Sequence, residues 1–276
     1  MPFRAVLPRA TKGIVIVCKS QVPPMEEILL KQLSPMGLLT LFQACLLYLL
    51  IFPAVTVYAQ TSNETIAIIG TGNVGSTLGR IWAEAGHTII YGSRTPDSDR
   101  VVSLVNATGN GASATTQAEA AQLAEIVFIP VPPAAIPEVI MALGDLTGKV
   151  IVDPTNWWEF EGDIVTSPRD PRESLAEQVQ ALAPDAMVIK AFNTLNYTVM
   201  ADPSLSAGPV TVPIAGNDLA AKQRVARLVE DVGLEPLDVG PLQFAEYLEE
   251  MLRLALGFRE LNSGIAFDYY LRIRPN

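Results

Sequence analysis

The chain contains little sulfur and almost no imidazole. Of its 276 residues only two are cysteines, Cys18 and Cys45, and only one is a histidine, His87. Because both cysteines precede residue 64, the rest of the chain has no thiol for a disulfide, a nucleophile or a thiolate metal site. A single imidazole is also too few for a histidine-bound zinc site. These absences exclude thiol catalysis and such metal centres from residues 64–276.

Positive charge is scarce over the same residues. The formal net charge is −10, yet residues 1–63 carry five basic and two acidic side chains, which leaves 14 basic and 27 acidic ones for residues 64–276. A surface so acidic would repel phosphates, so we expect no nucleic-acid partner. The apolar content of 49% is enough for a globular core.

Residues 1–63 have the character of a leader. No charged side chain occurs between residues 32 and 63, and the run 37–59 is almost wholly apolar. About 20 apolar residues span a bilayer, but Lys31 before the run and small residues near Ala59 are also typical of a secretory signal. We predict a signal peptide or a membrane anchor, so that the protein is exported to the periplasm or the outside, or is anchored through residues 37–59. Cleavage, a start at Met25 or Met36, and a domain that faces the cytoplasm remain open.

From residue 65 onward, short β-branched runs alternate with amphipathic stretches. This alternation predicts a Rossmann-like α/β domain over residues 64–276, with a doubly wound, mostly parallel sheet. Apolar residues at helical spacing in 242–262 predict a C-terminal helix that faces the core or a second copy in a homodimer. The expected strands are 65–69, 88–91, 125–131, 149–153, 187–192 and 210–215, and the other expected helices are 74–85, 134–143, 173–182 and 218–232.

A glycine-rich motif joins the first expected strand to the first expected helix, which is the context that a dinucleotide-binding fingerprint requires. Gly70 permits a tight turn, Gly72 lets the backbone approach a pyrophosphate, and Gly75 allows the helix to pack closely on the strand. The first amides of the helix would then face the anion. The predicted pyrophosphate site comprises Gly70, Thr71, Gly72, Asn73, Val74 and Gly75.

The end of the second expected strand indicates which nucleotide binds. Binders of NAD(H) usually carry an acidic residue there, which bonds the ribose 2′-hydroxyl. This chain has Ser93, Arg94 and Thr95 instead. An arginine pairs with a 2′-phosphate, and hydroxyl groups donate hydrogen bonds to it. We therefore predict NADP(H) rather than NAD(H).

Together with further motifs, this region resembles the NADPH-dependent deazaflavin (coenzyme F-420) reductases. The nucleotide-binding part is also similar to that of STEAP-type ferric reductases and of pyrroline-5-carboxylate reductases. The motifs that carry the resemblance are "IGTGNVGSTLGRIWAEAGH", "YGSRTP", "VFIPVPPAAIPEVI" (127–140), "KVIVDPTN" (149–156) and "IKAFNTL" (189–195).

The resemblance implies hydride transfer between NADP(H) and a deazaflavin or flavin. Such a step needs stacked rings and excluded water more than a proton donor. It also implies that Val131, Pro132 and Pro133 line the ribose and nicotinamide. Asn156 and Asn193 would contact the nicotinamide or its partner ring, and Lys190 and Asn193 are the candidate catalytic residues.

Two other functions remain open. A reductase of a small carbonyl or imine would need a positioned acid, for which Lys190 and Tyr197 are the candidates. A nucleotide-binding redox sensor would bind NADPH without turnover. Trp157 and Trp158 either stack on a partner ring or cover the core, and the loop 157–172 is the expected substrate-selecting segment.

Overall fold

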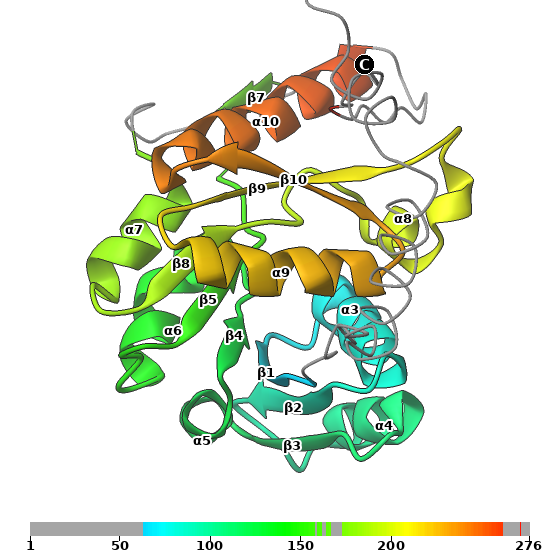
Figure 1. Ribbon diagram of the computed structural model, residues 1–276, viewed down its shortest axis with the longest axis vertical. Helices are drawn as coiled ribbons and strands as arrows, with labels where there is room; N and C mark the ends of the chain where they lie inside the picture. The colour runs from blue at the N-terminus through cyan, green and yellow to red at the C-terminus, as the bar shows by residue number, and fades with distance from the viewer. Residues whose placement is uncertain (1–62, 158, 162–163, 167–172, 262–270, 272–276) are drawn as a thin grey trace, which may run out of the picture. The chain divides into compact units, whose positions relative to one another are not determined.

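The computed structural model describes residues 63–157, 159–161, 164–166, 173–261 and 271 (Figure 1). The predicted leader, Trp158 and part of the loop after it lie outside the described residues. Within the described part of the chain, the structure contains no helix that is both long and apolar enough to span a membrane.

An eight-stranded sheet forms the centre of the domain, and it confirms the predicted Rossmann-like fold. Its strand order is β10-β9-β8-β5-β4-β1-β2-β3. Six neighbouring strands of the sheet run parallel to one another, namely β8, β5, β4, β1, β2 and β3. Strand β9 runs antiparallel to β8, and β10 runs parallel to β9. The strands are β1 (Thr65–Ile69), β2 (Thr88–Ser93), β3 (Ser113–Thr116), β4 (Ile126–Phe128), β5 (Val150–Asp153), β8 (Met187–Lys190), β9 (Thr211–Gly216) and β10 (Glu235–Gly240).

Helices cover both faces of the sheet, and each face has its own apolar core (Figure 1). Successive residues of a strand point to opposite faces, so Ile66 and Ile68 of β1 enter one core while Ala67 and Ile69 enter the other. The first core contains α3 (Asn73–Glu84), α8 (Tyr197–Ala201) and α9 (Leu219–Asp231). The second contains α5 (Gln117–Leu123), α6 (Ile136–Ala142), α7 (Leu175–Leu182) and the start of α10 (Ala245–Leu261).

Several elements differ from the expectations. The strand expected over 125–131 ends at Phe128, because three of the next five residues are prolines without an amide hydrogen. The strand expected over 187–192 ends at Lys190, since Phe192 adopts a φ of +63°. Sequence patterns also missed elements, namely β3, β10, α4 (Asp99–Thr108), α5, α8 and the 3-10 helix η2 (Pro203–Leu205). The 3-10 helix η1 (Pro133–Ala135) lies at the start of the helix expected over 134–143.

The segment expected to be a loop between residues 157 and 172 contains a small antiparallel hairpin. Its strands are β6 (Glu159–Glu161) and β7 (Ile164–Thr166), and β7 contacts α10. The C-terminal helix expected over 242–262 is observed as η3 (Leu242–Phe244) followed by α10. Helix α10 is bonded to the end of β8 and the residues after it, through Lys190–Glu249 and Asn193–Leu248.

Candidate active site

A groove of about 440 Å³ lies at the carboxyl ends of β1, β2 and β4. Ligands of open α/β sheets bind at this position, where the connections that follow neighbouring strands lead to opposite faces of the sheet. The groove is lined by Gly70, Thr71, Gly72, Gly92, Ser93, Arg94, Thr95, Ser98, Arg100, Val101, Gln117, Pro130, Val131, Pro132, Ala135, Glu138, Val139 and Ala142.

The three glycines of the motif serve different purposes. Gly70 has a φ of +133°, and a Cβ atom there would lie 2.7 Å from the Pro130 carbonyl oxygen. A Cβ on Gly75 would lie 2.0 Å from the carbonyl oxygen of Gly70. A Cβ on Gly72, in contrast, would meet no protein atom within 4 Å. Folding therefore requires glycine at positions 70 and 75, whereas the bare backbone at Gly72 leaves room for a ligand.

The amino end of α3 adjoins this opening. Gly72 is the N-cap of the helix, and among the described residues no side chain caps its first amides. Such amides, with the positive end of the helix dipole, attract anions. Asn73, Val74 and Gly75 form the first turn of α3 and are not among the residues that line the groove. This arrangement fits the backbone approach of a pyrophosphate to Gly72.

The β2–α4 connection supplies polar and cationic groups to the groove. Ser93, Arg94 and Thr95 all line it, and the Thr95 amide donates a hydrogen bond to Ser93 Oγ (3.1 Å). Ser98 Oγ donates to the Thr95 carbonyl oxygen (2.9 Å), which folds the connection into a compact turn. These residues place hydroxyl groups beside Arg94, as a phosphate site requires.

Arg100 is a lining residue that the sequence analysis missed. Its Nη2 atom donates a hydrogen bond to the Thr71 carbonyl oxygen (2.8 Å), and this bond joins α4 to the glycine-rich loop. Ser98 was missed as well. Neither residue was named, because α4 itself was not expected. The signal that would have found both is Ser98 followed by Asp99, a capping residue and an acidic first turn.

The segment after β4 forms the opposite part of the lining. Val131 and Pro132 line the groove, while Pro133 begins η1 and is not a lining residue. The Val131 amide donates to the Ile129 carbonyl oxygen (2.8 Å), which fixes the turn. Glu138, from α6, is the one carboxylate among the lining residues, and it does not come from the β2–α4 connection.

Asn156 and Asn193, which the resemblance named as candidate site residues, lie together at the carboxyl ends of β5 and β8. Asn156 Nδ2 donates to the Asn193 carbonyl oxygen (2.9 Å), and Asn193 Nδ2 donates to Asn156 Oδ1 (2.9 Å). Asn193 Nδ2 also donates to the Leu248 carbonyl oxygen of α10 (2.9 Å). The turn that presents Asn193 is strained, because the bulky Phe192 before it has a φ of +63°.

Among the residues that the structure describes, two buried polar atoms at this corner find no hydrogen-bond partner, namely Asn193 Oδ1 and Trp157 Nε1. An unpaired buried donor or acceptor costs about 1–3 kcal/mol. Native proteins rarely leave such atoms unpaired without a reason, and functional sites are one of the reasons.

Lys190 is fully buried and forms an ion cluster with two carboxylates. Its Nζ atom donates to Asp153 Oδ2 (2.9 Å), to Glu249 Oε1 (2.8 Å) and to the Thr155 carbonyl oxygen. Burial alone would lower the pKa of the Lys190 ammonium, but the charges of Asp153 and Glu249 outweigh it and raise that pKa above its usual value. Lys190 therefore stays charged and ties β5 and β8 to α10.

Tyr197 and His87 lie away from the groove lining. Tyr197 begins α8 and is exposed. His87 Nδ1 accepts a hydrogen bond from the Glu64 amide (3.0 Å), and its Nε2 lies 2.9 Å from Asp231 Oδ2. His87 thus links the start of β1 to the end of α9, which is a structural role.

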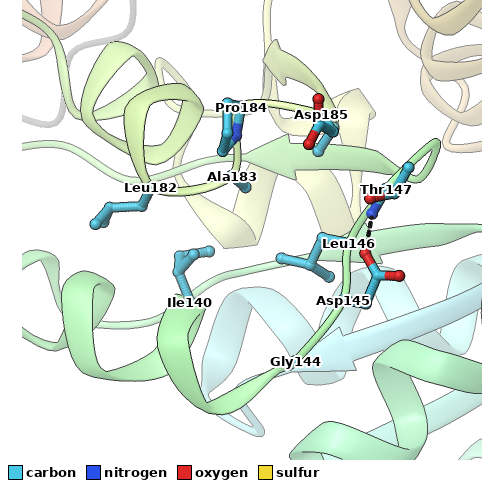
Figure 2. Close-up of a pocket in the computed structure, with 10 residues that line it drawn as sticks. Ile140, Gly144, Asp145, Leu146, Thr147, Leu182, Ala183, Pro184 and Asp185 are labelled. Atoms are coloured by element: carbon cyan, nitrogen blue, oxygen red, sulfur yellow. Dashed lines mark hydrogen bonds between the residues drawn. The ribbon is translucent and has the colours of Figure 1, made fainter.

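A second hollow, of about 160 Å³, lies near the amino ends of β5 and β8 (Figure 2). Its lining comes from the segments that precede β5 and β8, where Ile140, Leu146 and Leu182 contribute apolar side chains. The Thr147 amide donates to Asp145 Oδ1 (2.9 Å), so this carboxylate is used locally. Within the described residues, no group of three or more histidine, cysteine, aspartate or glutamate side chains is placed to hold a metal.

The chain is similar to several known proteins. Residues 65–157 match the family model described as NADP oxidoreductase, coenzyme F420-dependent. The metalloreductase STEAP3 of Rattus norvegicus is 31% identical over 194 residues, which cover 68% of this chain but 36% of that protein. The chain thus spans about a third of the length of this curated relative.

Two solved structures extend the similarity beyond the first half of the domain. A proposed F420-dependent NADP-reductase from Arthrobacter sp. FB24 superposes with a TM-score of 0.69 at 29% identity, over 76% of this chain and all of that one. A hypothetical protein from Sinorhizobium meliloti gives a TM-score of 0.56 at 34% identity, over 66% of this chain and 87% of that one. With its glycine-rich loop, its sheet order and these relatives, the chain belongs to the NAD(P)-binding Rossmann oxidoreductases.

Proposed function

We propose that the protein binds NADP(H) in the groove and exchanges a hydride with a deazaflavin or flavin ring. The observation that carries the first part is the grouping of Arg94 and Arg100 with the hydroxyl groups of the β2–α4 connection in the groove lining. A ribose 2′-phosphate needs cations and hydroxyl donors there, whereas a free 2′-hydroxyl would need a carboxylate.

The remaining parts of the nucleotide have matching surfaces along the same edge of the sheet. Gly72 and the uncapped first turn of α3 would hold the pyrophosphate. Val131 and Pro132 would border the ribose next to the nicotinamide, and Asn156 and Asn193 would lie at the nicotinamide end. NADPH, when bound, supplies the hydride for the reaction.

The proposed acceptor is a flat ring, because the site residues offer no proton donor of the kind that a carbonyl or imine substrate would need. Lys190 is buried among three acceptors, and Tyr197 does not line the groove, so neither offers an obvious proton donor to a substrate. A hydride transfer between two flat rings needs alignment and exclusion of water rather than such a donor. The family description and the Arthrobacter relative both name coenzyme F420, and they support a deazaflavin as the first acceptor to test.

A binding experiment tests the nucleotide assignment. NADPH and NADH are titrated into the full chain by calorimetry, in the wild type and in Arg94→Asp and Arg100→Ala. We expect the wild type to prefer NADPH, and Arg94→Asp to weaken NADPH binding by about 10- to 100-fold, since a charged pair becomes a repulsion. Arg80→Asp, an exposed position on α3 outside the groove, is the matched control for the change in net charge. Equal affinities for NADPH and NADH in the wild type would contradict the assignment.

Turnover then tests the acceptor. Loss of the absorbance of reduced nicotinamide is followed with a deazaflavin, with FMN and with a panel of small carbonyls and imines. We expect turnover with a deazaflavin or FMN but not with the carbonyls and imines. At a low NADPH concentration, Arg94→Asp should abolish this turnover. Turnover with the carbonyl panel alone would replace the acceptor in the proposal, and tight NADPH binding with no turnover would favour a redox sensor.

A further inference from the structure

We propose that α10 packs against α10 of a second copy of the chain, with the two helices antiparallel. The contact would use the side of α10 that faces away from the domain. This side, the outer stripe, consists of Phe244, just before the helix, and of Tyr247, Met251, Leu254 and Phe258. Such a dimer would form whether or not the groove binds a nucleotide.

Helix α10 has two apolar sides, and the domain uses one of them. Ala245, Leu248 and Glu249 are buried, and Glu249 accepts a hydrogen bond from Lys190. With 3.6 residues per turn, Met251 lies about 200° around the helix axis from Glu249, and the rest of the outer stripe lies on the same side as Met251. The outer stripe therefore faces away from the core that holds α10, which lies at one end of the domain (Figure 1).

The outer stripe is exposed and regularly spaced. The exposed fractions are 37% for Phe244, 60% for Tyr247, 73% for Leu254 and 41% for Phe258, and Met251 is half-buried. The ring centroids of Phe244 and Tyr247 lie 5.9 Å apart, so the stripe continues across the start of the helix. Successive members are three or four residues apart in alternation, which is the spacing with which one helix packs against another. A single exposed apolar side chain needs no explanation, but a row at this spacing indicates a helical partner.

Gly257 gives a second and independent indication. It lies within α10 beside Leu254 on the helix surface, although glycine destabilises a helix relative to alanine. A Cβ atom on Gly257 would meet no atom of the described chain within 4 Å, so packing inside the domain does not require a glycine there. A backbone without a side chain allows a second helix to approach closely.

The charges beside the outer stripe favour a second copy as the occupant, in the antiparallel direction. Glu246, Glu250 and Arg253 share one flank of the stripe, and Glu250 and Arg253 form an ion pair of 2.5 Å. A twofold axis that relates two antiparallel helices puts these flanks on the same side in reversed order, so Arg253 of each copy lies near Glu250 of the other. In a parallel pair, each flank would instead meet the side of the other helix that carries Ala255. A flank with both signs in this order is thus complementary to its own reversed copy.

One register of the two helices suits both the stripe and its flanks. It places Tyr247 against Phe258 of the other copy and Met251 against Leu254 of the other copy, so that each layer of the contact is apolar. From Tyr247 to Phe258 the stripe extends about 16 Å along the helix. Because this contact is short compared with permanent interfaces, we expect a reversible dimer.

Disulfide cross-linking in the full chain tests the contact and its direction. Cys18→Ser and Cys45→Ser first remove the two native thiols. Tyr247→Cys and Phe258→Cys are then made separately in this background, and the two variants are oxidised alone and as a mixture. We expect the mixture to give several-fold more cross-linked dimer than either variant alone, because the two positions face each other only between antiparallel copies. Leu219→Cys, at an exposed position of α9, measures the yield from random collisions.

Two further substitutions connect the cross-link to the outer stripe. Added to both cysteine variants, Leu254→Glu should lower the yield by at least about 10-fold, because the contact would then bury a charge in place of a leucine. Gly257→Gln should lower the yield without lowering the unfolding temperature, since glutamine is the better helix former and meets no described neighbour within the chain. Leu219→Glu changes a similarly exposed leucine of α9, and this matched control should leave the yield unchanged.

Three results would overturn the proposed dimer. A mixture that cross-links no better than Leu219→Cys would show that α10 makes no such contact. Higher yields for the single variants than for the mixture would show that the helices are not antiparallel. Unchanged yields with both Leu254→Glu and Gly257→Gln would show that the cross-link does not depend on the outer stripe. NADPH affinity, measured in the same variants, should equal that of the wild type, so the dimer and the nucleotide site are tested separately.

Discussion

Asn156 and Asn193 are 37 residues apart in the chain, yet each donates a hydrogen bond to the other, both of 2.9 Å. The pair joins the carboxyl ends of β5 and β8, although neither asparagine is among the residues that line the groove. Asn193 is 3% exposed, so water cannot easily replace a lost bond. The pair is therefore a rigid part of the site rather than a surface contact.

Removing this pair should affect both stability and binding. We expect Asn156→Ala to lower the free energy of unfolding by about 1–3 kcal/mol, because buried groups of Asn193 lose their partners. NADPH binding should weaken, and binding of 2′-phospho-ADP-ribose, which lacks the nicotinamide, should not. Urea denaturation and calorimetry measure the two effects. Asn196→Ala, which removes the cap of α8 by deleting its bond with the Thr198 amide, should affect stability alone.

Because Lys190 is buried between two carboxylates, replacing it should lower the free energy of unfolding much more than replacing the surface lysine Lys222. Lys190→Met leaves Asp153 and Glu249 buried without their shared cation, so we expect a loss of about 3–5 kcal/mol in the free energy of unfolding. Lys222→Met removes a pair with the exposed Asp238 and should cost less than about 1 kcal/mol. Similar losses for both variants in urea denaturation would contradict a structural role for the cluster.

The ion pair between Glu64 and Arg224 predicts an acid-sensitive contribution to stability. Burial, the largest influence, raises the pKa of Glu64, but the two hydrogen bonds and the charge of Arg224 together hold it below its ordinary value of 4.5. The contribution is therefore complete above about pH 4.5 and is lost as the pH falls through the lower, folded-state pKa.

Denaturation midpoints measured between neutral and acid pH test this prediction. Arg224→Met should be less stable than the wild type at neutral pH, and the difference should shrink as the solution becomes acidic. Arg227→Met is the control, since Arg227 is half-exposed and lies 3.9 Å from the same carboxylate. A constant difference across the pH range would show that Arg224 stabilises the fold by packing and not by charge.

Two glycine-to-alanine substitutions in the glycine-rich loop should differ in effect: Gly75→Ala should impair folding, whereas Gly72→Ala should impair NADPH binding. Gly75→Ala places a methyl group against the carbonyl oxygen of Gly70, and we expect a loss of several kcal/mol or failure to fold. Gly72→Ala meets no protein atom and should leave the unfolding temperature nearly unchanged. It should nevertheless weaken NADPH binding by at least about 10-fold, because the methyl group fills the space next to the pyrophosphate. Unchanged NADPH affinity would show that the pyrophosphate lies elsewhere.

The fold class was predictable because its signals are local. The run Thr65–Ile69, the glycine motif and the stripe of apolar residues in α3 follow one another without interruption, so strand, loop and helix could each be recognised. Strand β3 is a different case, since "SATT" at the edge of the sheet has little apolar character and owes its conformation to pairing with β2. The reversed direction of β9 likewise depends on tertiary packing and not on its own residues.

The candidate site came from two sources. Ser93 was named from its place at the end of a strand, whereas Val131, Asn156 and Asn193 were named from the family resemblance. All four follow parallel strands, whose carboxyl ends share one end of the sheet. The role of Lys190 was not predictable, because it depends on a partner far along the chain, Glu249, which is 59 residues away. For Trp157, one of the two expected roles was to cover the core, and its side chain packs against the second core.

The bond between Glu64 and Arg224 also has a consequence for synthesis. It connects residues 160 positions apart, and Trp82 of α3 is bonded to Leu228, 146 positions away. Strand β1 and helix α3 thus await α9, one of the last described elements of the domain. Until then one flank of the nascent sheet remains uncovered, so a chain interrupted before residue 219 should expose Trp82 and its neighbours and become a substrate for chaperones or proteases.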